Sequence, residues 1–268
     1  PFVQRQWEAD GRAPVLALTE GQKKDGREAL RRLGVPDDAW FAALHVRDPG
    51  FFNEDLGRSP NTFRNVDIGA YGPAIEAIVE RGGWVVRLGD QSAPPLPSRP
   101  GVVDYARSDE RSPEMDVFCC AACRFFVGSD SGPVWVAGAF GVPVVETDWS
   151  TLGVWPVPEQ DIFVPKTLRD AEGRAMSLSQ MVESAFYGVT AAAAFERRGI
   201  AVVDNGPEDI RDAVVEMIDR LEGTIEYSDE DERLQARFRE LADPYGVGIS
   251  SRVGQGFLRR HPELLEDG

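Results

Sequence analysis

Short apolar runs alternate with amphipathic stretches almost from one end of this chain to the other. The pattern is typical of a parallel sheet with helices on both faces, because buried parallel strands are apolar nearly throughout. Strands are expected at 40–46, 84–88, 102–104, 125–128, 142–146, 162–164 and 200–203. We therefore expect an α/β fold with a doubly wound, mostly parallel, Rossmann-like sheet.

Helix signals lie between these runs. Thr19 and Gln22 have the spacing of a capping box, which predicts that a helix begins there. The most regular helix is expected at 207–221, where apolar residues recur on one face. An acidic helix is expected at 229–241.

Composition excludes several classes of protein. The 268 residues include 29 Lys and Arg against 45 Asp and Glu, a net charge of −16 that repels nucleic acid. No apolar run reaches the roughly 18 residues of a membrane span, and no signal peptide is visible. Cys119, Cys120 and Cys123 lie too close together to link distant segments, so we expect reduced thiols in a core helix and a cytoplasmic protein.

The stretch 129–133 is the most informative turn in the chain. Ser129, Asp130, Ser131, Gly132 and Pro133 join an expected buried strand to an expected helix. The N–H groups at a helix N-terminus attract anions, and glycine lets a phosphate approach closely. The turn is therefore either a phosphate site or only a helix cap.

Polar residues also follow other expected strands. These residues are His45, Arg47, Asp48, Arg87, Asp104 and Tyr105. The carboxyl ends of parallel strands share one edge of a sheet, where ligands bind. Arg47, Arg58, Arg64 and Arg87 would together make a local anion site in an acidic protein. The polar stretch 47–67 is long enough to be a functional loop.

Two motifs resemble those of known enzymes. The stretch 128–145 resembles the nucleotide-diphosphate motif of heptosyltransferase-type GT-B glycosyltransferases, although Trp135 stands where those enzymes have His. Residues 44–48, Leu-His-Val-Arg-Asp, resemble the H-x-R motif of fucosyltransferase-like GT-B enzymes.

The motifs in combination are similar to a family of bacterial glycosyltransferases linked to surface-polysaccharide genes. The likeness extends over about 14–265 and includes the stretches at 45–48, 64–68, 85–89, 104–105, 115–116, 129–132, 164–166 and 256–265. It implies that 19–268 is the donor-binding half of a GT-B enzyme, with C-terminal helices. Residues 1–18 would be a linker or the remnant of an acceptor domain, and the start at Pro1 suggests a fragment or a processed product.

The resemblance implies transfer of a sugar from a nucleotide-diphosphate sugar to a glycan, lipid-linked or protein acceptor. It implies no cofactor besides the donor nucleotide and no metal, because arginines replace the cation. The missing acceptor half would come from a partner domain or chain.

The resemblance and the strand-end positions together assign a role to each candidate residue. Arg47, Arg87, Ser129, Ser131 and Gly132 would bind the donor phosphates, and Asp104 and Tyr105 would bind the nucleoside. Asp48 or His45 would act as the general base, with Arg47 as a further catalytic group. Arg64, Asn65, Asp130 and Lys166 would support the site.

Two other functions fit the same sequence. An isomerase or a pyruvyl-type transferase could use the same architecture to bind a sugar nucleotide. A binding module without catalysis is favoured by the missing half and by Trp135. Fold alone does not separate these alternatives.

Overall fold

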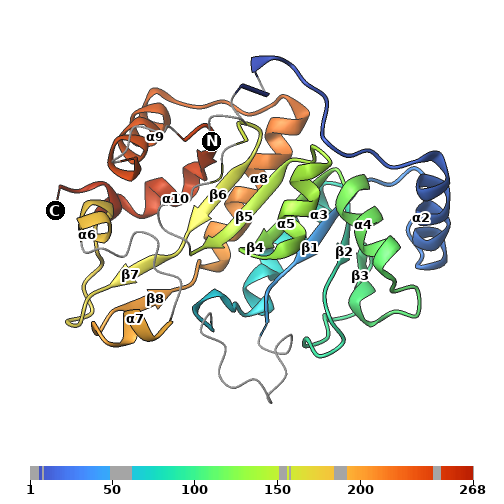
Figure 1. The fold of residues 1–268 in the computed structure, drawn as a ribbon, viewed down its shortest axis with the longest axis horizontal. Helices are drawn as coiled ribbons and strands as arrows, with labels where there is room; N and C mark the ends of the chain where they lie inside the picture. Colours follow the sequence, from blue (N-terminus) through green and yellow to red (C-terminus); the bar gives the residue numbers. More distant parts are fainter. Residues whose placement is uncertain are drawn as a thin grey trace.

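A seven-stranded sheet forms the centre of the computed structural model (Figure 1). The structure describes residues 6–7, 9–48, 62–150, 156, 158–183, 192–243 and 249–267. Most of the predicted functional loop, including Arg58, lies outside the described residues. The main strands are β1 (Phe41–His45), β2 (Trp84–Arg87), β3 (Val102–Val103), β4 (Phe125–Ser129), β5 (Val144–Trp149), β6 (Ile162–Pro165) and β9 (Arg252–Val253).

The strand order is β3-β2-β1-β4-β5-β6-β9, and all neighbouring pairs are parallel. After β1 the chain adds β2 and β3 on one side of β1, and then adds β4, β5, β6 and β9 on the other side. Ala42 lies in register with Val85 of β2 and Phe125 of β4, and all three are fully buried. The order thus reverses between β1 and β4, which is where ligands bind in open α/β sheets.

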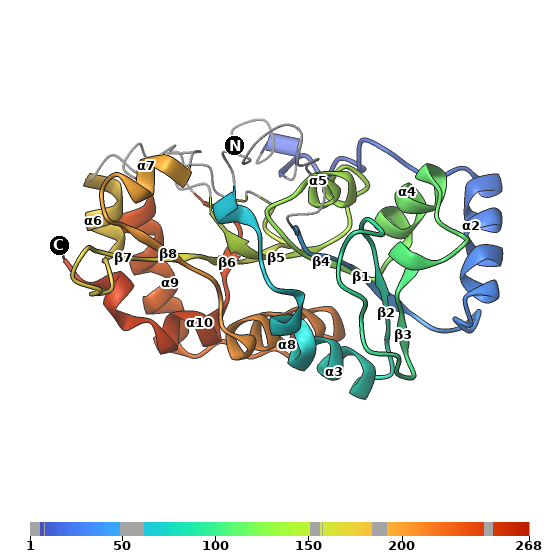
Figure 2. The ribbon, with the colours of Figure 1, turned by 90° about the horizontal axis from the view of Figure 1, so that it is seen from below.

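Helices cover both faces of this sheet, as the alternating pattern predicted. They are α2 (Glu20–Arg32), α3 (Gly72–Glu80), α4 (Pro113–Ala122), α5 (Gly132–Ala139), α6 (Leu178–Glu183), α7 (Ala192–Glu196), α8 (Pro207–Glu222), α9 (Asp229–Ala242) and α10 (Gln255–Arg260). Figure 2 shows α3 and α8 on one face and α4 and α5 on the other. The doubly wound α/β prediction is therefore confirmed.

The predicted helix ends are also found. Thr19 caps α2 and forms the predicted capping box with Gln22. Helix α8 begins at Pro207 and is followed by Gly223, whose φ of 70° belongs to the left-handed region that favours glycine. Ser228 caps the acidic helix α9.

One strand prediction needs a correction. The segment expected at 200–203 forms β8 (Ala201–Val203), but β8 pairs antiparallel with β7 (Thr167–Arg169) in a separate two-stranded sheet. The edge position in the main sheet is taken by β9, whose two residues are too few to give a periodic pattern. Which of the two segments joins the main sheet is decided by backbone pairing with distant strands, and composition does not reveal this pairing.

The three cysteines are free, buried and carried by or next to α4, as predicted for a core helix. Burial raises the pKa of Cys120 to about 12, so its thiol is neutral at physiological pH. Within the parts of the chain that the structure describes, no helix has the length and apolar character of a membrane span.

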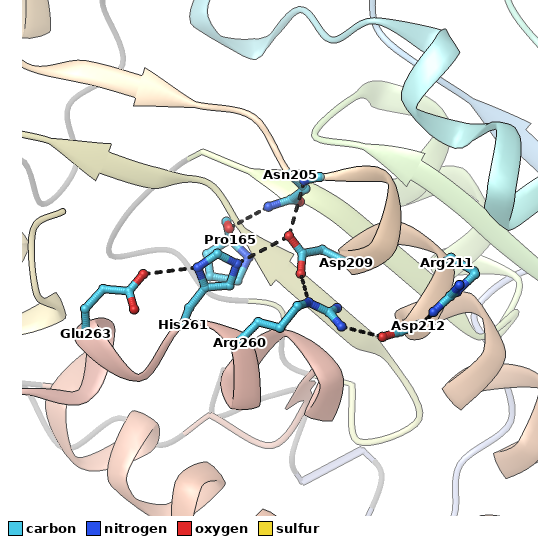
Figure 3. Close-up of polar contacts among 9 residues, drawn as sticks. Pro165, Asn205, Asp209, Arg211, Asp212, Arg260, His261 and Glu263 are labelled. Carbon is cyan, nitrogen blue, oxygen red and sulfur yellow. Dashed lines mark hydrogen bonds and ion pairs between the residues drawn. The ribbon is translucent and has the colours of Figure 1, made fainter. Parts of the chain in front are cut away.

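A charged cluster joins the start of α8 to the C-terminal end of α10 (Figure 3). His261 contacts the Asp209 carboxylate through Nε2 at 3.3 Å and Glu263 through Nδ1 at 3.1 Å. Arg260 donates from Nε to Asp209 at 2.7 Å. The hydrogen bond to Asp209 is the main cause that raises the pKa of His261 above its ordinary 6.5, and the bond to Glu263 adds to it against partial burial.

Stability should therefore depend on the protonation of His261. Because its folded-state pKa is raised, its contribution is fully present below the ordinary value of 6.5 and is lost as the pH rises through the folded-state pKa. We expect His261→Gln to remove this part of the pH dependence of the free energy of unfolding, measured by urea denaturation between pH 5.5 and 8.5. Equal slopes in the wild type and the variant would contradict the assignment.

Candidate functional site

Two hydrogen bonds cross the reversal point between β1 and β4. His45, the last residue of β1, shares a hydrogen bond of 2.9 Å between its Nδ1 and the Ser131 Oγ. Two residues further on, the Arg47 backbone N–H donates to the Ser129 Oγ at 2.9 Å. The structure thus brings the predicted residues of the two strand ends together.

The first turn of α5 is open toward this point. Ser131 occupies the N-cap position with extended backbone, yet its side chain makes no capping hydrogen bond. Its hydroxyl contacts His45 instead, and Pro133 in the first turn has no N–H to satisfy. A Cβ added at Gly132 would meet no heavy atom within 4 Å, so there is open space directly at the helix start.

Two cavities lie along this edge of the sheet. The first has a volume of about 380 Å³ and is lined by His45, Arg47, Asp48, Leu88, Gly89, Asp90, Arg111, Asp116, Cys120, Ser131, Gly132 and Pro133. The second, of about 530 Å³, is lined by Val46, Asp48, Asn65, Val66, Asp67, Ile68, Arg87, Ser92 and Pro94. Asp48 belongs to both linings. The first cavity is in the size range of small-molecule sites.

The His45 imidazole is neutral at physiological pH. Its pKa is lowered to about 4, mainly by burial; the charge of Asp48 opposes this shift, and the positive charges of Arg87 and Arg47 add to it. A neutral ring has one nitrogen that donates and one that accepts. His45 can therefore orient the Ser131 hydroxyl without adding a charge to the cavity.

Arg47 contributes positive charge to the first cavity. Its Nε donates to the Asn65 Oδ1 at 3.3 Å, which orients the guanidinium. Partial burial lowers its pKa, and the neighbouring Arg64 lowers it further, but an arginine remains charged at physiological pH.

Arg64 and Asp130 are bound to each other. The Arg64 guanidinium donates to the Asp130 carboxylate at 2.5 Å and to its backbone carbonyl at 2.7 Å. Ser150 donates from Oγ to the other Asp130 oxygen at 3.1 Å. These contacts fix the conformation of the turn before α5, and the supporting roles of Arg64 and Asp130 toward a ligand stay predictions.

Arg87 and Asp104 form a largely buried ion pair. The Arg87 side chain is 2% exposed, and its guanidinium donates to an Asp104 oxygen at 2.8 Å and to the Pro94 carbonyl at 3.3 Å. The other Asp104 oxygen accepts from the Leu96 N–H at 3.0 Å. Arg87 lines the second cavity. However, Arg87, predicted to bind phosphate, and Asp104, predicted to bind the nucleoside, are hydrogen-bonded to each other.

Tyr105 requires a correction, because the residue is completely buried and offers no surface to a nucleoside. Its hydroxyl donates to the Ser112 carbonyl at 3.1 Å and accepts from the Ser112 N–H at 3.0 Å. Ser112 is the N-cap of α4. Tyr105 therefore holds the start of α4 in place.

Lys166 lies outside both cavity linings, at the end of β6. Its buried ammonium pairs with Asp204 and lies 3.6 Å from Asp148. Asp148 has a φ of 53°, a conformation that non-glycine residues rarely adopt, and its carboxylate accepts from the Asn205 N–H at 2.8 Å. The structure thus places Lys166 in a separate polar cluster and not beside the α5 start.

Several cavity residues carried no assigned role in the sequence. Arg111, Asp116 and Cys120 reach the first cavity from α4 and the segment before it. The pattern around them predicts only a core helix, because contact with the cavity depends on how α4 packs beside α5. The sequence signal that could have identified Asp116 is the pair Met115-Asp116, which is one of the motifs of the family resemblance.

Comparisons with known proteins add little to this geometry. No protein-family model matches the chain, and neither does any curated protein. Among solved structures, the chain is similar to a glycosyl transferase family 9 protein from Veillonella parvula DSM 2008, with 13% identity and a TM-score of 0.41. The match covers 57% of this chain and 42% of that protein, which is less than half of its length. The fold assignment therefore depends on the strand order itself.

Among the described residues, no group of three or more His, Cys, Asp or Glu side chains is placed to hold a metal ion. Metal independence stays a prediction.

Tyr105→Phe tests the corrected role of Tyr105. The variant leaves the Ser112 N–H and carbonyl without their partner, so we expect a loss of about 1–3 kcal/mol in the free energy of unfolding. Urea denaturation measures this loss, and nucleotide affinity should not change. Unchanged stability together with weaker nucleotide binding would return Tyr105 to the ligand site.

Proposed function

We propose that this chain binds a nucleotide-diphosphate sugar with its diphosphate at the start of α5, and that it acts in glycosyl transfer. One observation carries the proposal. The Ser131 hydroxyl is held by His45 across the reversal point, so the first turn of α5 keeps its N–H groups uncapped beside a cavity that Arg47 lines. Uncapped helix N-termini with a neighbouring cation are suited to phosphate.

The electrostatics support a single diphosphate at this place. The chain carries a net charge of −16, which repels long polyanions. Arg47 lines the first cavity beside the positive end of the α5 dipole. Asp48, Asp90 and Asp116 line the same cavity, so binding of an anion depends on direct contacts with Arg47 and the α5 start. A compact anion gains from these short-range contacts, whereas a polymer would also meet the acidic surface.

The site residues can stabilise the leaving group of the transfer. An acceptor hydroxyl would attack the anomeric carbon, the bond from that carbon to the phosphate oxygen would break, and the nucleoside diphosphate would leave with the electron pair. Negative charge grows on the departing phosphate. Arg47 and the N–H groups of the α5 start are fixed before the reaction, and fixed donors stabilise such charge effectively.

Asp48 is the better placed of the two predicted general bases. Asp48 belongs to the linings of both cavities, so it would lie near an acceptor bound in one cavity and a donor bound in the other. His45 is neutral and could accept a proton, but its Nδ1 already contacts Ser131. We therefore propose that Asp48 takes the acceptor proton and that His45 positions Ser131.

The acceptor would be bound by another domain or chain. The proposal extends to a role in surface polysaccharide or glycoconjugate synthesis and to a cytoplasmic location. It also includes the assignment of residues 19–268 to the donor-binding domain and of residues 1–18 to a linker or remnant. These parts depend on the resemblance of motifs alone.

A non-catalytic nucleotide-sugar-binding module is the second candidate, and Trp135 favours it. This side chain stands where the similar enzymes carry His, and it is 59% exposed on α5 with its ring against Trp149. Donor binding without donor hydrolysis or transfer would support this second candidate.

Two variants test the diphosphate site. Arg47→Ala removes a charged donor from the leaving phosphate, which typically costs ~2.7–4 kcal/mol, so turnover should fall by about two to three powers of ten. Ser131→Ala should weaken binding of UDP, GDP or dTDP sugars in isothermal titration calorimetry. It also leaves the His45 Nδ1 without its partner, so a circular dichroism melt checks that the variant is folded at the titration temperature.

Arg174→Ala is the matched control, because Arg174 is exposed and pairs only with surface carboxylates in the described structure. It should bind nucleotide sugars as the wild type does. The proposal is wrong if no nucleotide sugar binds the wild type, or if neither site variant changes binding.

A further inference from the structure

We infer that Asp116 recognises the base of the bound nucleotide, and that this base is guanine. The inference rests on the proposed function. It comes from one feature of the first cavity. Asp116 lines this cavity together with Ser131 and Gly132, and its Oδ1 is buried without any hydrogen-bond partner.

The position of Asp116 suits the nucleoside end of a ligand. Helix α4 packs beside α5, and both helices contribute residues to the lining of the cavity. Ser131 and Gly132 contribute the start of α5, whereas Asp116 and Cys120 contribute the α4 wall. A nucleotide with its phosphates at α5 would therefore extend toward Asp116.

The structure gives the Oδ1 of Asp116 no hydrogen-bond donor. An ionised carboxylate only accepts hydrogen bonds, and a buried acceptor without a partner is costly. The Cβ–Cγ torsion of aspartate is broad, so both oxygens can turn toward a ligand at small cost. A ligand that enters the cavity can supply the N–H donor that Oδ1 lacks.

Guanine presents the matching pair of donors. Its N1–H and N2 amino group lie side by side and fit the two oxygens of one carboxylate. Uracil instead flanks its single N–H with two carbonyl oxygens, and adenine and cytosine each place a ring acceptor beside the amino group. These acceptors would face the carboxylate and be repelled. Arg111 lines the same cavity and supplies the kind of donor that pairs with guanine O6 and N7.

The test compares GDP, IDP and UDP by isothermal titration calorimetry. IDP differs from GDP only by the absence of the N2 amino group, so it isolates one of the two predicted hydrogen bonds. We expect the wild type to bind GDP about tenfold or more tightly than IDP or UDP. Asp116→Asn should weaken GDP binding by about tenfold to a hundredfold and abolish the preference of GDP over IDP.

Glu114→Gln is the matched control, since it removes the same charge from an exposed position in the first turn of α4. It should keep the wild-type affinity and the GDP preference, and circular dichroism melting checks that both variants fold. Equal binding of GDP and UDP by the wild type would overturn the inference, as would a GDP preference that survives in Asp116→Asn. Binding of UDP that depends on Ser131 would leave the proposed function standing without the guanine assignment. No binding of any nucleoside diphosphate would overturn both.

Discussion

The reversal of strand order between β1 and β4 is the constraint on which the site depends. Because the seven strands are parallel, their carboxyl ends meet at one edge of the sheet. The chain leaves β1 toward α3 on one face and leaves β4 toward α5 on the other, so the two helices that follow these strands lie on opposite sides of the sheet (Figure 2). The hydrogen bond between His45 and Ser131 spans this gap and turns the serine away from its own helix.

The distribution of arginines gives this gap its chemical character. The sequence suggested that four arginines would gather around one anion. The structure pairs Arg64 with Asp130 and Arg87 with Asp104, as expected of charges that are removed from water. Arg47 and Arg111 line the cavity beside the α5 start, but Asp48, Asp90 and Asp116 line it too, and Arg111 lies 3.9 Å from Asp90. The positive charge is therefore local to Arg47 and the start of α5.

The elements that sequence predicts well are those with a local cause. The apolar strand β1, the capping box of Thr19 and Gln22 and the periodic helix α8 each follow from residues within one element. The placement of β8 outside the main sheet depends on pairing between distant segments, which local pattern does not encode.

The same distinction applies to the site. The turn 129–133 could be located because its residues are contiguous. The ion pair of Arg87 with Asp104, the burial of Tyr105 and the contribution of Asp116 all depend on packing between helices and strands. Strand-end position and the family resemblance suggested ligand contacts for Arg87, Asp104 and Tyr105, whereas the structure gives these residues intramolecular partners.

The central claim is that a diphosphate binds the uncapped start of α5. Amide NMR of the isotope-labelled protein during titration with a nucleoside diphosphate tests it most directly. The account predicts that the backbone amides of Ser131, Gly132 and Val134 shift first and farthest, as phosphate oxygens accept their hydrogen bonds. Saturating shifts elsewhere, with these three amides unmoved, would contradict it.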